Sequence, residues 1–405
     1  MSCASTGAAA SITKRAVVAA VAASRQVRTV GMLRSLLYPA PCRGARRRHA
    51  IGRPAALATG CRHPCKMPSG RTRAAGLRGV WAGYSSLRTS TAHPMLAVVL
   101  AAGKGSRMAP LNAELPKALV PTLDTPQLAW VLAGLRRAGL DRVWVNAHAD
   151  HEAIDRSVAH EAARREMTIS VSHERDVALG TAGALKPIAG ELTEAFLVAN
   201  ADIATDLAVE RLIEAHRSAK AAATVLAIPV EDEADFALEQ SWVFDLIDRR
   251  EEVRSGHRYG GMAIFEPEVL SYVPEGESGL YETVFKGLVR DHKGFAALEW
   301  DGYWLDIATP KDHLKANLDV LAGMRDPKLA TDAAGEACER WDVMAFVGEG
   351  ALVEDVDLRH SVVGKRVAIA PGSRLERCLV WAGAHLPRGD YRDTIITPNR
   401  QLPVR

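Results

Sequence analysis

Acidic residues are absent from the first 94 positions of this 405-residue chain, although those positions carry 16 of its 51 lysines and arginines. Subtracting the 16 leaves 35 basic groups against 48 acidic groups in residues 95–405, a formal net charge of −13. The overall charge of +3 therefore hides two unlike parts. A basic leader is joined to an acidic part that is long enough for a large core and more than one domain.

The leader lacks sustained apolar periodicity as well as acidic residues, so residues 1–94 are expected to be disordered. Three explanations compete. An organellar transit peptide is typically rich in Arg and Ser and poor in acids. A secretory signal would use Lys14-Arg15 and the apolar Ala16–Ala23, but that run is short and much of the leader follows it. We favour an over-extended gene start, because Met95 stands where a compact domain would begin.

Cysteine is scarce, with six residues in the chain. Four of them fall in the leader, at Cys3, Cys42, Cys61 and Cys65. The other two, Cys338 and Cys378, imply no disulfide framework, which fits a reducing cytoplasm as the predicted location. Cys61 and Cys65 lack a second ligand pair, so no zinc site is expected. Nucleic-acid binding is one interpretation of the Arg46–Arg48 cluster, but a solvated basic tail is favoured. Neither nucleic acid nor a membrane is an expected partner.

A short apolar run followed by glycines gives the first chemical signal. Leu96–Ala101, rich in Val and Leu, has the length of a buried parallel strand. Gly103 and Gly105 follow, and without a Cβ their backbone N–H groups can close around phosphate oxygens. Arg107 adds a planar, permanently charged fork, and Lys117 adds a mobile point charge. Together these groups indicate binding of a nucleoside triphosphate.

Two better-known glycine loops are excluded by the residues around this one. A Walker loop needs its lysine directly after the second glycine, whereas Lys104 lies between the two glycines. A dinucleotide fingerprint needs a third glycine where this chain has Met108. Taken alone, Gly103 and Gly105 are explained equally well by a tight turn from strand to helix.

The longer string around the loop is more specific. Gly103–Met108, Pro110-Leu111 and Leu115–Leu119 closely resemble the signature of the sugar-1-phosphate nucleotidyltransferases, enzymes that make nucleotide sugars. The resemblance covers residues 96 to about 320 and implies a Rossmann-like three-layer α/β nucleotidyltransferase domain over residues 95–325. It also implies nucleotide binding by Ala101, Ala102, Gly103, Gly105 and Ser106.

Beyond the loop, strand-like and helix-like segments alternate, which is typical of a mostly parallel sheet covered by helices. Helices are predicted over residues 126–140, 152–165 and 311–322, and strands over residues 142–147, 167–172, 196–200 and 259–265. The polar stretch 228–258 shows no readable pattern.

Two further glycine-containing strings follow in the order that the family has. Leu179–Leu185 reads LGTAGAL, and a close helix-to-sheet contact explains it as well as ligand binding does. In the family such a string lies beside the base and ribose, so the resemblance implies nucleotide binding by Gly180, Thr181 and Ala182. The string Tyr259–Phe265 resembles the family's next strand, on which Gly260 and Gly261 would face the sugar ring.

Two aspartates are the predicted metal ligands. Asp202 follows the strand at 196–200, and ligands collect at this edge of open α/β sheets, although a turn or helix cap also explains a strand-end Asp. Asp306 lies in Gly302–Pro310, which resembles the family's GxWxDIGTP motif. Carboxylates suit Mg²⁺, which bridges substrate phosphates. The resemblance implies catalytic roles for Arg107, Lys117 and Asp202, Mg²⁺ on Asp202 and Asp306, and sugar contact by Asn200.

Departures from the family pattern leave a second class of function open. Ala201 and Ala308 stand where the family has glycine, and the Glu-Lys pair that touches the sugar in many relatives has no clear match. If the family glycine needs a positive φ, Ala201 would be strained. The alternative function is a catalytically inactive, nucleotide-sugar-binding regulatory subunit of the same fold. A nicotinamide oxidoreductase is disfavoured by Met108 and by Pro116-Lys117.

The pattern changes in the tail, residues 340–405. Leu358 and Val363 are matched 17 residues later by Leu375 and Val380, and such short apolar steps indicate coils of a β-helix. Many sugar nucleotidyltransferases, notably the mannose-1-phosphate guanylyltransferases, carry a short left-handed β-helix there, used for oligomer contacts or regulation. The tail therefore favours GTP and mannose 1-phosphate as the NTP and sugar 1-phosphate, and a homo-oligomer as the assembled form.

Overall fold

The computed structural model of the protein describes residues 95–148, 151–247, 255–334 and 338–404. The predicted disordered leader, residues 1–94, lies outside the described residues, and so do residues 248–254. None of the helices within the described ranges is long and apolar enough to cross a membrane.

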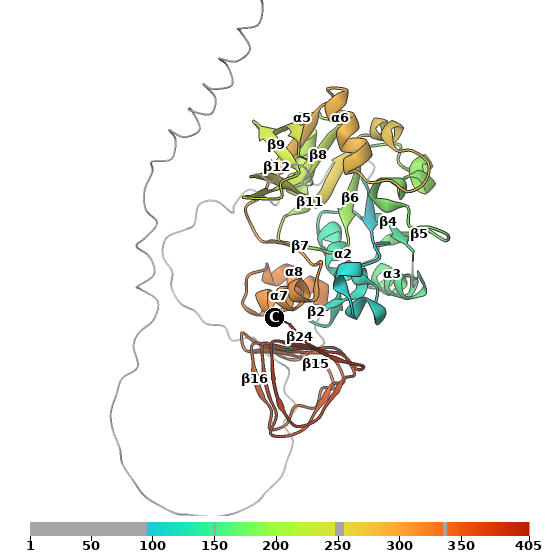
Figure 1. Cartoon of the computed structure of the whole chain (residues 1–405). Coiled ribbons are helices and arrows are strands. Elements are labelled where there is room, and N and C mark those ends of the chain that lie inside the picture. Colours follow the sequence, from blue (N-terminus) through green and yellow to red (C-terminus); the bar gives the residue numbers. More distant parts are fainter. Residues whose placement is uncertain (1–94, 149–150, 248–254, 335–337, 405) are drawn as a thin grey trace, which may run out of the picture. The chain divides into compact units, whose positions relative to one another are not determined.

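A nine-stranded sheet of the described residues forms the larger core, in the order β5-β4-β1-β6-β11-β8-β12-β10-β9 (Figure 1). Its strands are β1 (Leu96–Leu100), β4 (Arg142–Ala147), β5 (Thr168–His173), β6 (Phe196–Asn200), β8 (Ala223–Val230), β9 (Phe236–Glu239), β10 (Trp242–Leu246), β11 (Gly256–Phe265) and β12 (Phe295–Glu299). The four strands β5, β4, β1 and β6 run parallel, as the alternating pattern predicted. β11 pairs antiparallel with both β6 and β8, so the sheet is mixed rather than mostly parallel.

One part of the antiparallel pairing, that of β9 with β10, has a local cause. These strands are joined by Gln240 and Ser241, whose positive φ values of 50° and 67° suit a tight two-residue hairpin turn. A hairpin makes its strands antiparallel, whereas a parallel pair needs a long crossover. Both strands lie within residues 228–258, where no pattern was readable. β10 buries Val243 but leaves Phe244 exposed, which weakens the apolar alternation.

Side chains of β1 alternate between two hydrophobic cores, so helices cover both faces of the sheet. Ala97 and Val99 pack with Leu128 of α2 (Gln127–Arg137) on one face. Leu96 and Val98 belong to the second core, on the other face. This two-sided burial is what an uninterrupted apolar run predicts. The other α-helices of the described residues are α3 (His151–Arg165), α4 (Gly180–Gly183), α5 (Val209–Ala219), α6 (Lys286–Arg290), α7 (Pro310–Leu321) and α8 (Pro327–Ala334).

A small antiparallel pair connects two distant parts of the chain. β7 (Ile203–Thr205) pairs with β13 (Trp304–Asp306), and Ile203 lies opposite Asp306. Just beyond β13, Thr309 begins α7 with a capping box, in which its hydroxyl accepts from the Asp312 N–H (3.2 Å) and its own N–H donates to the Asp312 carboxylate (2.9 Å). The predicted helix after Asp306 is therefore confirmed, and Asp306 is held at its entrance.

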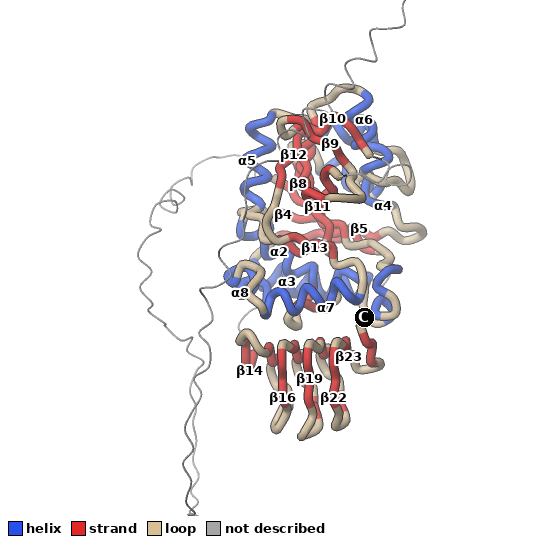
Figure 2. Tube along the Cα trace, turned by 60° about the vertical axis from the view of Figure 1, so that its left-hand side comes forward, coloured by secondary structure: helices blue, strands red, loops and turns tan. Residues whose placement is uncertain are grey.

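The C-terminal strands form stacked coils with three sides, which Figure 1 shows as a triangle and Figure 2 shows edge-on. Their strands are β14 (Cys338–Trp341), β15 (Ala345–Gly348), β16 (Asp357–Arg359), β17 (Ser361–Val363), β18 (Ala368–Ile369), β19 (Arg374–Glu376), β20 (Leu379–Val380), β21 (His385–Leu386), β22 (Asp390–Arg392), β23 (Thr394–Ile396) and β24 (Gln401–Pro403). The 17-residue repeat is confirmed by the register, because Leu358 pairs with Leu375 and Val363 with Val380 in parallel strands. The hand of the coil stays a prediction.

A third core joins these coils to the α/β part. Val362 and Ile395 of the coils pack in it with Leu111, which follows the glycine loop. Within this core the indole Nε1–H of Trp381 donates to Nε2 of His313 on α7 (3.2 Å). His313 is fully buried, and burial lowers its pKa to about 3. The imidazole must therefore stay neutral, because a proton on Nε2 would remove the acceptor for Trp381.

The buried imidazole predicts acid sensitivity of the folded state. Its pKa is lower in the folded chain than the ordinary value of 6.5, so stability is complete above 6.5 and is lost progressively as the pH falls from 6.5 towards 3. We expect His313→Gln, whose amide oxygen can accept from Trp381, to remove this loss. The free energy of unfolding, measured by urea titration from pH 7 to pH 5, should fall less steeply in the variant by about 1.4 kcal/mol per pH unit. Equal slopes in the two proteins would contradict the assignment.

Candidate active site

The glycine loop packs against Lys117, a later residue of the same sequence signature. Gly105 has φ +59°, the left-handed region that favours glycine, and it precedes the short 3-10 turn Ser106–Met108. A Cβ at Gly105 would lie 2.9 Å from the Cβ of Lys117, so glycine is required for this approach as well. The loop thereby brings Arg107 and Lys117 to one side of the sheet, at the carboxyl ends of β1 and β6.

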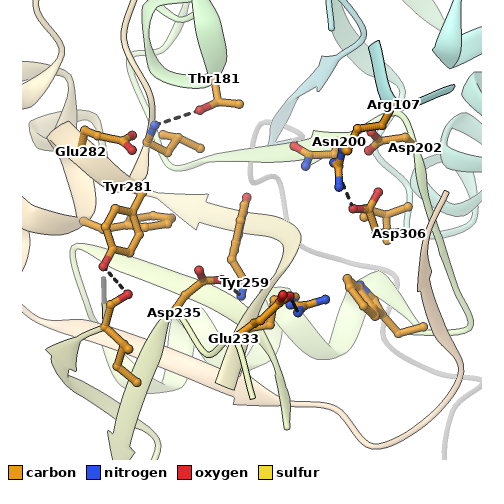
Figure 3. A pocket seen from close by; sticks show the side chains of 16 residues that line it. Arg107, Thr181, Asn200, Asp202, Glu233, Asp235, Tyr259, Tyr281, Glu282 and Asp306 are labelled. Atoms are coloured by element: carbon orange, nitrogen blue, oxygen red, sulfur yellow. Dashed lines mark hydrogen bonds and ion pairs between the residues drawn. The ribbon is translucent and has the colours of Figure 1, made fainter. Parts of the chain in front are cut away.

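Four charged side chains meet at this edge. Nζ of Lys117 lies 2.5 Å from Oδ2 of Asp202 and 3.7 Å from Oδ1 of Asp306. Nη2 of Arg107 lies 3.7 Å from Oδ2 of Asp306 (Figure 3). The Lys117 side chain is 11% exposed, whereas that of Arg107 is 68% exposed and can turn towards a ligand. The structure thus gathers all the residues predicted to be catalytic or metal-binding; we call these four residues the charged centre.

The charged centre is suited to a divalent cation. Burial, and after it the negative charge of Asp202, raise the pKa of Asp306 above its usual value. Oδ1 of Asp202 is buried and has no hydrogen-bond partner among the described residues. Mg²⁺ prefers oxygen ligands such as carboxylates. The two neighbouring carboxylates, one of which has an oxygen without a partner among the described residues, therefore fit this ion. Within the described ranges no third His, Cys, Asp or Glu joins them, so further oxygens would have to come from ligands or water.

A buried polar relay that the sequence analysis missed connects the two glycine-containing loops. The amide oxygen of Asn146 accepts from the Ala101 N–H (2.6 Å), and its NH₂ donates to Glu174 (2.7 Å). The other Glu174 oxygen accepts from the Leu179 N–H, just before Gly180 (2.7 Å). Asn146 lies near the end of β4 and Glu174 directly follows β5. Their position at the carboxyl edge of parallel strands was a usable signal.

The predicted nucleotide-binding residues line one cavity of about 410 Å³ or stand just behind it. Among its lining residues are Ala102, Gly103, Gly105, Ser106, Gly180 and Thr181. Gly180 has φ +76°, and a Cβ there would come within 2.5 Å of the Ser278 carbonyl oxygen. Ala182 is fully buried behind the cavity, where its N–H donates to the same oxygen (2.9 Å). Ala101 is likewise buried, and its N–H donates to the Asn146 amide oxygen.

A second cavity, of about 540 Å³, adjoins the charged centre (Figure 3). Asn200, a predicted sugar-binding residue, lines both cavities, and its buried amide oxygen has no partner among the described residues. Gly260 and Gly261 are not among its lining residues. A Cβ at Gly260 would strike Leu226, and Gly261 combines φ +76° with a Cβ position that would strike Ile203, so packing and backbone conformation account for both glycines. The polar lining that the sequence did not indicate comes from Glu233, Asp235, Arg258, Tyr259, Tyr281 and Glu282.

Comparison with known families identifies this arrangement. A model of the nucleotidyl transferase family matches residues 96–323, more than half of the chain. The chain belongs to this family. The membership expected from the signature around Gly103 and Lys117 is therefore confirmed, and both cavities lie within the matched region.

Individual relatives of this nucleotidyl transferase agree with that assignment. A mannose-1-phosphate guanylyltransferase of Mycobacterium tuberculosis is 27% identical over 305 residues, which are 73% of this chain and 82% of that protein. A UTP–glucose-1-phosphate uridylyltransferase of Synechocystis is 32% identical over 248 residues, 56% of this chain and 64% of that protein. A solved structure, titled a putative glucose-1-phosphate thymidylyltransferase from Bacillus anthracis, is 20% identical with a TM-score of 0.50, covering 57% of this chain and 96% of that one. It supports the fold.

The two alanines that replace family glycines are accommodated without left-handed backbone in this nucleotidyl transferase. Neither Ala201 nor Ala308 has a positive φ. The Ala201 N–H donates to the Leu100 carbonyl oxygen (3.0 Å), and its side chain is buried. The strain considered for Ala201 is therefore absent, and the backbone still delivers Asp202 to the charged centre.

The raised pKa of Asp306 predicts that its ionised carboxylate lowers the stability of the folded protein near neutral pH. A carboxylate whose pKa is raised by folding stabilises the folded state at low pH and loses that contribution as the pH rises through its folded pKa. At pH 7.5 we therefore expect Asp306→Asn to raise Tm by a few degrees. Added Mg²⁺ should raise the Tm of the wild-type protein more than that of the variant. A lower Tm in the variant, or equal shifts with Mg²⁺, would contradict this account of the charged centre.

Proposed function

We propose that the protein transfers a nucleotidyl group from an NTP to a sugar 1-phosphate, giving an NDP-sugar and pyrophosphate. The observation that carries the proposal is that two cavities share a wall formed by Arg107, Thr181, Asn200 and Asp202. One cavity is bounded by the glycine loops and suits a nucleotide. The other is rich in hydrogen-bonding side chains and suits a sugar. The charged centre stands at their junction, where the phosphates of the two substrates would meet.

The reaction needs positioning and charge neutralisation more than a base. A phosphate monoester is already anionic near pH 7, since its second pKa is about 6. One of its oxygens attacks the α-phosphorus of the NTP, the α–β bridging P–O bond breaks, and pyrophosphate leaves with the bonding electrons. Lys117 is placed to neutralise the α-phosphate and the attacking oxygen, and the exposed Arg107 is free to accompany the departing pyrophosphate.

Asp202 and Asp306 are the residues that would hold Mg²⁺. When bound, Mg²⁺ would supply positive charge to substrate phosphate oxygens. The protein's own contribution is to fix the two carboxylates side by side, through the β7–β13 pairing, and to balance them with Lys117. The crowded negative charge of the two aspartates is then an arrangement for binding a cation together with a phosphate.

GTP and mannose 1-phosphate are the substrates that we propose. The M. tuberculosis relative is named for mannose 1-phosphate and guanylyl transfer. Glu174, which lines the nucleotide cavity, carries a carboxylate that only accepts hydrogen bonds and keeps lone pairs beyond those used by Asn146 and Leu179. Guanine presents adjacent N1–H and N2–H donors to such a group, whereas uracil and thymine flank their single N–H with carbonyl oxygens.

The tail is proposed to be a short left-handed β-helix that takes part in a homo-oligomer. Its three-sided parallel coils support a β-helix, and the left hand is itself part of the proposal. A catalytically inactive subunit of the same fold is the competing proposal, and the intact charged centre argues against it.

The decisive experiment is pyrophosphate release by the full chain with Mg²⁺, over four NTPs and several sugar 1-phosphates. We expect release only when one NTP and one sugar phosphate are both present, with GTP and mannose 1-phosphate as the best pair. Asp202→Asn should lower kcat about 100-fold or more, because a metal ligand is lost. Asp301→Asn, an exposed aspartate close in sequence to Asp306, is the matched control and should be unchanged. Silence across the grid, with nucleotide sugar still bound, would favour the inactive subunit.

Tyr259 provides a test of the sugar cavity. Its hydroxyl oxygen is buried without a hydrogen-bond partner among the described residues, although its ring lines the cavity (Figure 3). We expect Tyr259→Phe to raise the KM for the sugar phosphate about five- to tenfold, leave the KM for the NTP unchanged, and keep or raise Tm, because an unsatisfied buried group costs stability. Tyr272→Phe, which removes a surface hydroxyl bonded to Asp291, is the control. An unchanged sugar KM in Tyr259→Phe would refute the assignment.

A further inference from the structure

Glu114 is a largely enclosed carboxylate inside the catalytic signature, and the proposed chemistry does not use it. Its side chain is 9% exposed, and it stands three residues before Lys117. Three donors from one distant turn satisfy it. Oε1 accepts from Nε of Arg400 (2.5 Å) and from the Thr397 hydroxyl (2.9 Å), and Oε2 accepts from the Asn399 side-chain amide (3.1 Å). We call this set of contacts the Glu114 clasp.

The donor side of the clasp is preorganised by its own backbone. The turn lies between β23 and β24, at the end of the C-terminal coils. The Thr397 hydroxyl accepts from the N–H groups of Asn399 (3.2 Å) and Arg400 (3.1 Å), and the Thr397 N–H donates to the Arg400 carbonyl oxygen (2.9 Å). The three donors thus present a fixed shape, which suits a contact that sets position.

The backbone between Glu114 and Lys117 has little conformational freedom. The N–H groups of Glu114 and Leu115 both donate to the Leu111 carbonyl oxygen (3.0 and 3.3 Å), so the chain enters this segment as a tight turn. Pro116 follows with φ −51°, fixed by its ring. Its carbonyl oxygen accepts from the Leu119 N–H (2.8 Å), which closes the turn that carries Lys117. A displacement of Glu114 would therefore move Lys117 relative to Asp202.

A second contact holds the same segment on its other side. Oδ2 of Asp124 accepts from the Lys365 N–H in the coils (3.1 Å), and burial raises the pKa of Asp124. Asp124 lies in the turn between β2 (Pro121–Thr122) and β3 (Thr125–Pro126). The segment that carries Lys117 is thus fixed to the coils both before and after the lysine.

Adhesion between the coils and the α/β part does not require the clasp. The third hydrophobic core already joins them, with Leu111 and Val120 from this segment packed against Val362 and Ile395. Apolar packing is non-directional, whereas a carboxylate held by three donors fixes orientation. The polar contacts therefore fix the lateral position of the Lys117 segment on the coils, which the apolar core does not fix.

We infer that Glu114 is a positioning residue, through which the C-terminal coils hold Lys117 against Asp202 and Asp306. The inference rests on the proposed nucleotidyl transfer, in which Lys117 acts on the transferred phosphate. The coils then have a direct part in catalysis within a single chain. Loss of the clasp lowers the rate of the chemical step while leaving both cavities, and hence substrate binding, in place.

The test compares kcat and KM of the full chain with those of Glu114→Gln, Arg400→Gln and the double variant. In Glu114→Gln the new side-chain NH₂ would face the donors of the turn, so we expect kcat to fall about five- to tenfold while both KM values stay within about twofold. The double variant should be no worse than the poorer single variant, because both changes remove one contact. Arg377→Gln is the matched control, since it breaks the Arg377–Asp393 pair within the coils (2.5 Å) without touching the signature. Its kcat should be unchanged.

Amide hydrogen exchange of Leu119 and Val120 supplies a readout that is independent of turnover. Their N–H groups close the Lys117 turn, so exchange should speed up in Glu114→Gln and Arg400→Gln but not in Arg377→Gln. A kcat within twofold of wild type in Glu114→Gln, unchanged exchange, or an equal kcat loss in Arg377→Gln would overturn the inference. A wild-type chain without turnover would instead refute the proposed function, and the exchange data would still decide whether the clasp holds the turn.

Discussion

Repulsion between two carboxylates that must stand side by side is the constraint on which the rest of the site depends. The β7–β13 pairing forces Asp306 next to the backbone of Asp202, and partial burial keeps water from screening them. The ammonium group of Lys117 lies 2.5 Å from Asp202 and offsets this repulsion. Gly105 has no side chain, which leaves the space that Lys117 requires. The ion pair of Lys117, the β7–β13 pairing and the absence of a side chain at Gly105 therefore depend on one another.

Much of this arrangement was readable in the sequence, because it uses local rules. An apolar run with glycines predicts a buried strand and a phosphate loop, and the structure has β1 and its cavity there. Asp202 could be placed because parallel strands end at a common edge, and the 17-residue repeat fixed the register of Leu358 against Leu375. The family signature added the pairing of Asp202 with Asp306, which no local rule provides across about 100 residues.

The parts that could not be read depend on distant partners. Asn146 and Glu174 stand at strand ends that the sequence did indicate, but the hydrogen bonds by which they connect two loops follow only from the fold. Tyr259 reads as a strand residue, and only the packing reveals that it lines the cavity with a hydroxyl that has no partner among the described residues. The antiparallel pair β9 and β10 was missed because β10 exposes Phe244 next to the buried Val243, which blurs the apolar alternation. In each case the sequence gives the residue type, but the contacts that the residue makes are known only from the fold.

The coil register has a consequence for how the length of this protein can change. Each turn of the coil occupies about 17 residues and advances the chain by one strand spacing, about 4.8 Å. Inserting or deleting a whole coil would preserve the hydrophobic interior, and a repeat protein normally tolerates that. Here it would carry the turn at Thr397–Arg400 one spacing away from Glu114. The number of coils in the tail is therefore coupled to the signature at the start of the α/β part, because adding or removing a coil would separate Glu114 from its three donors.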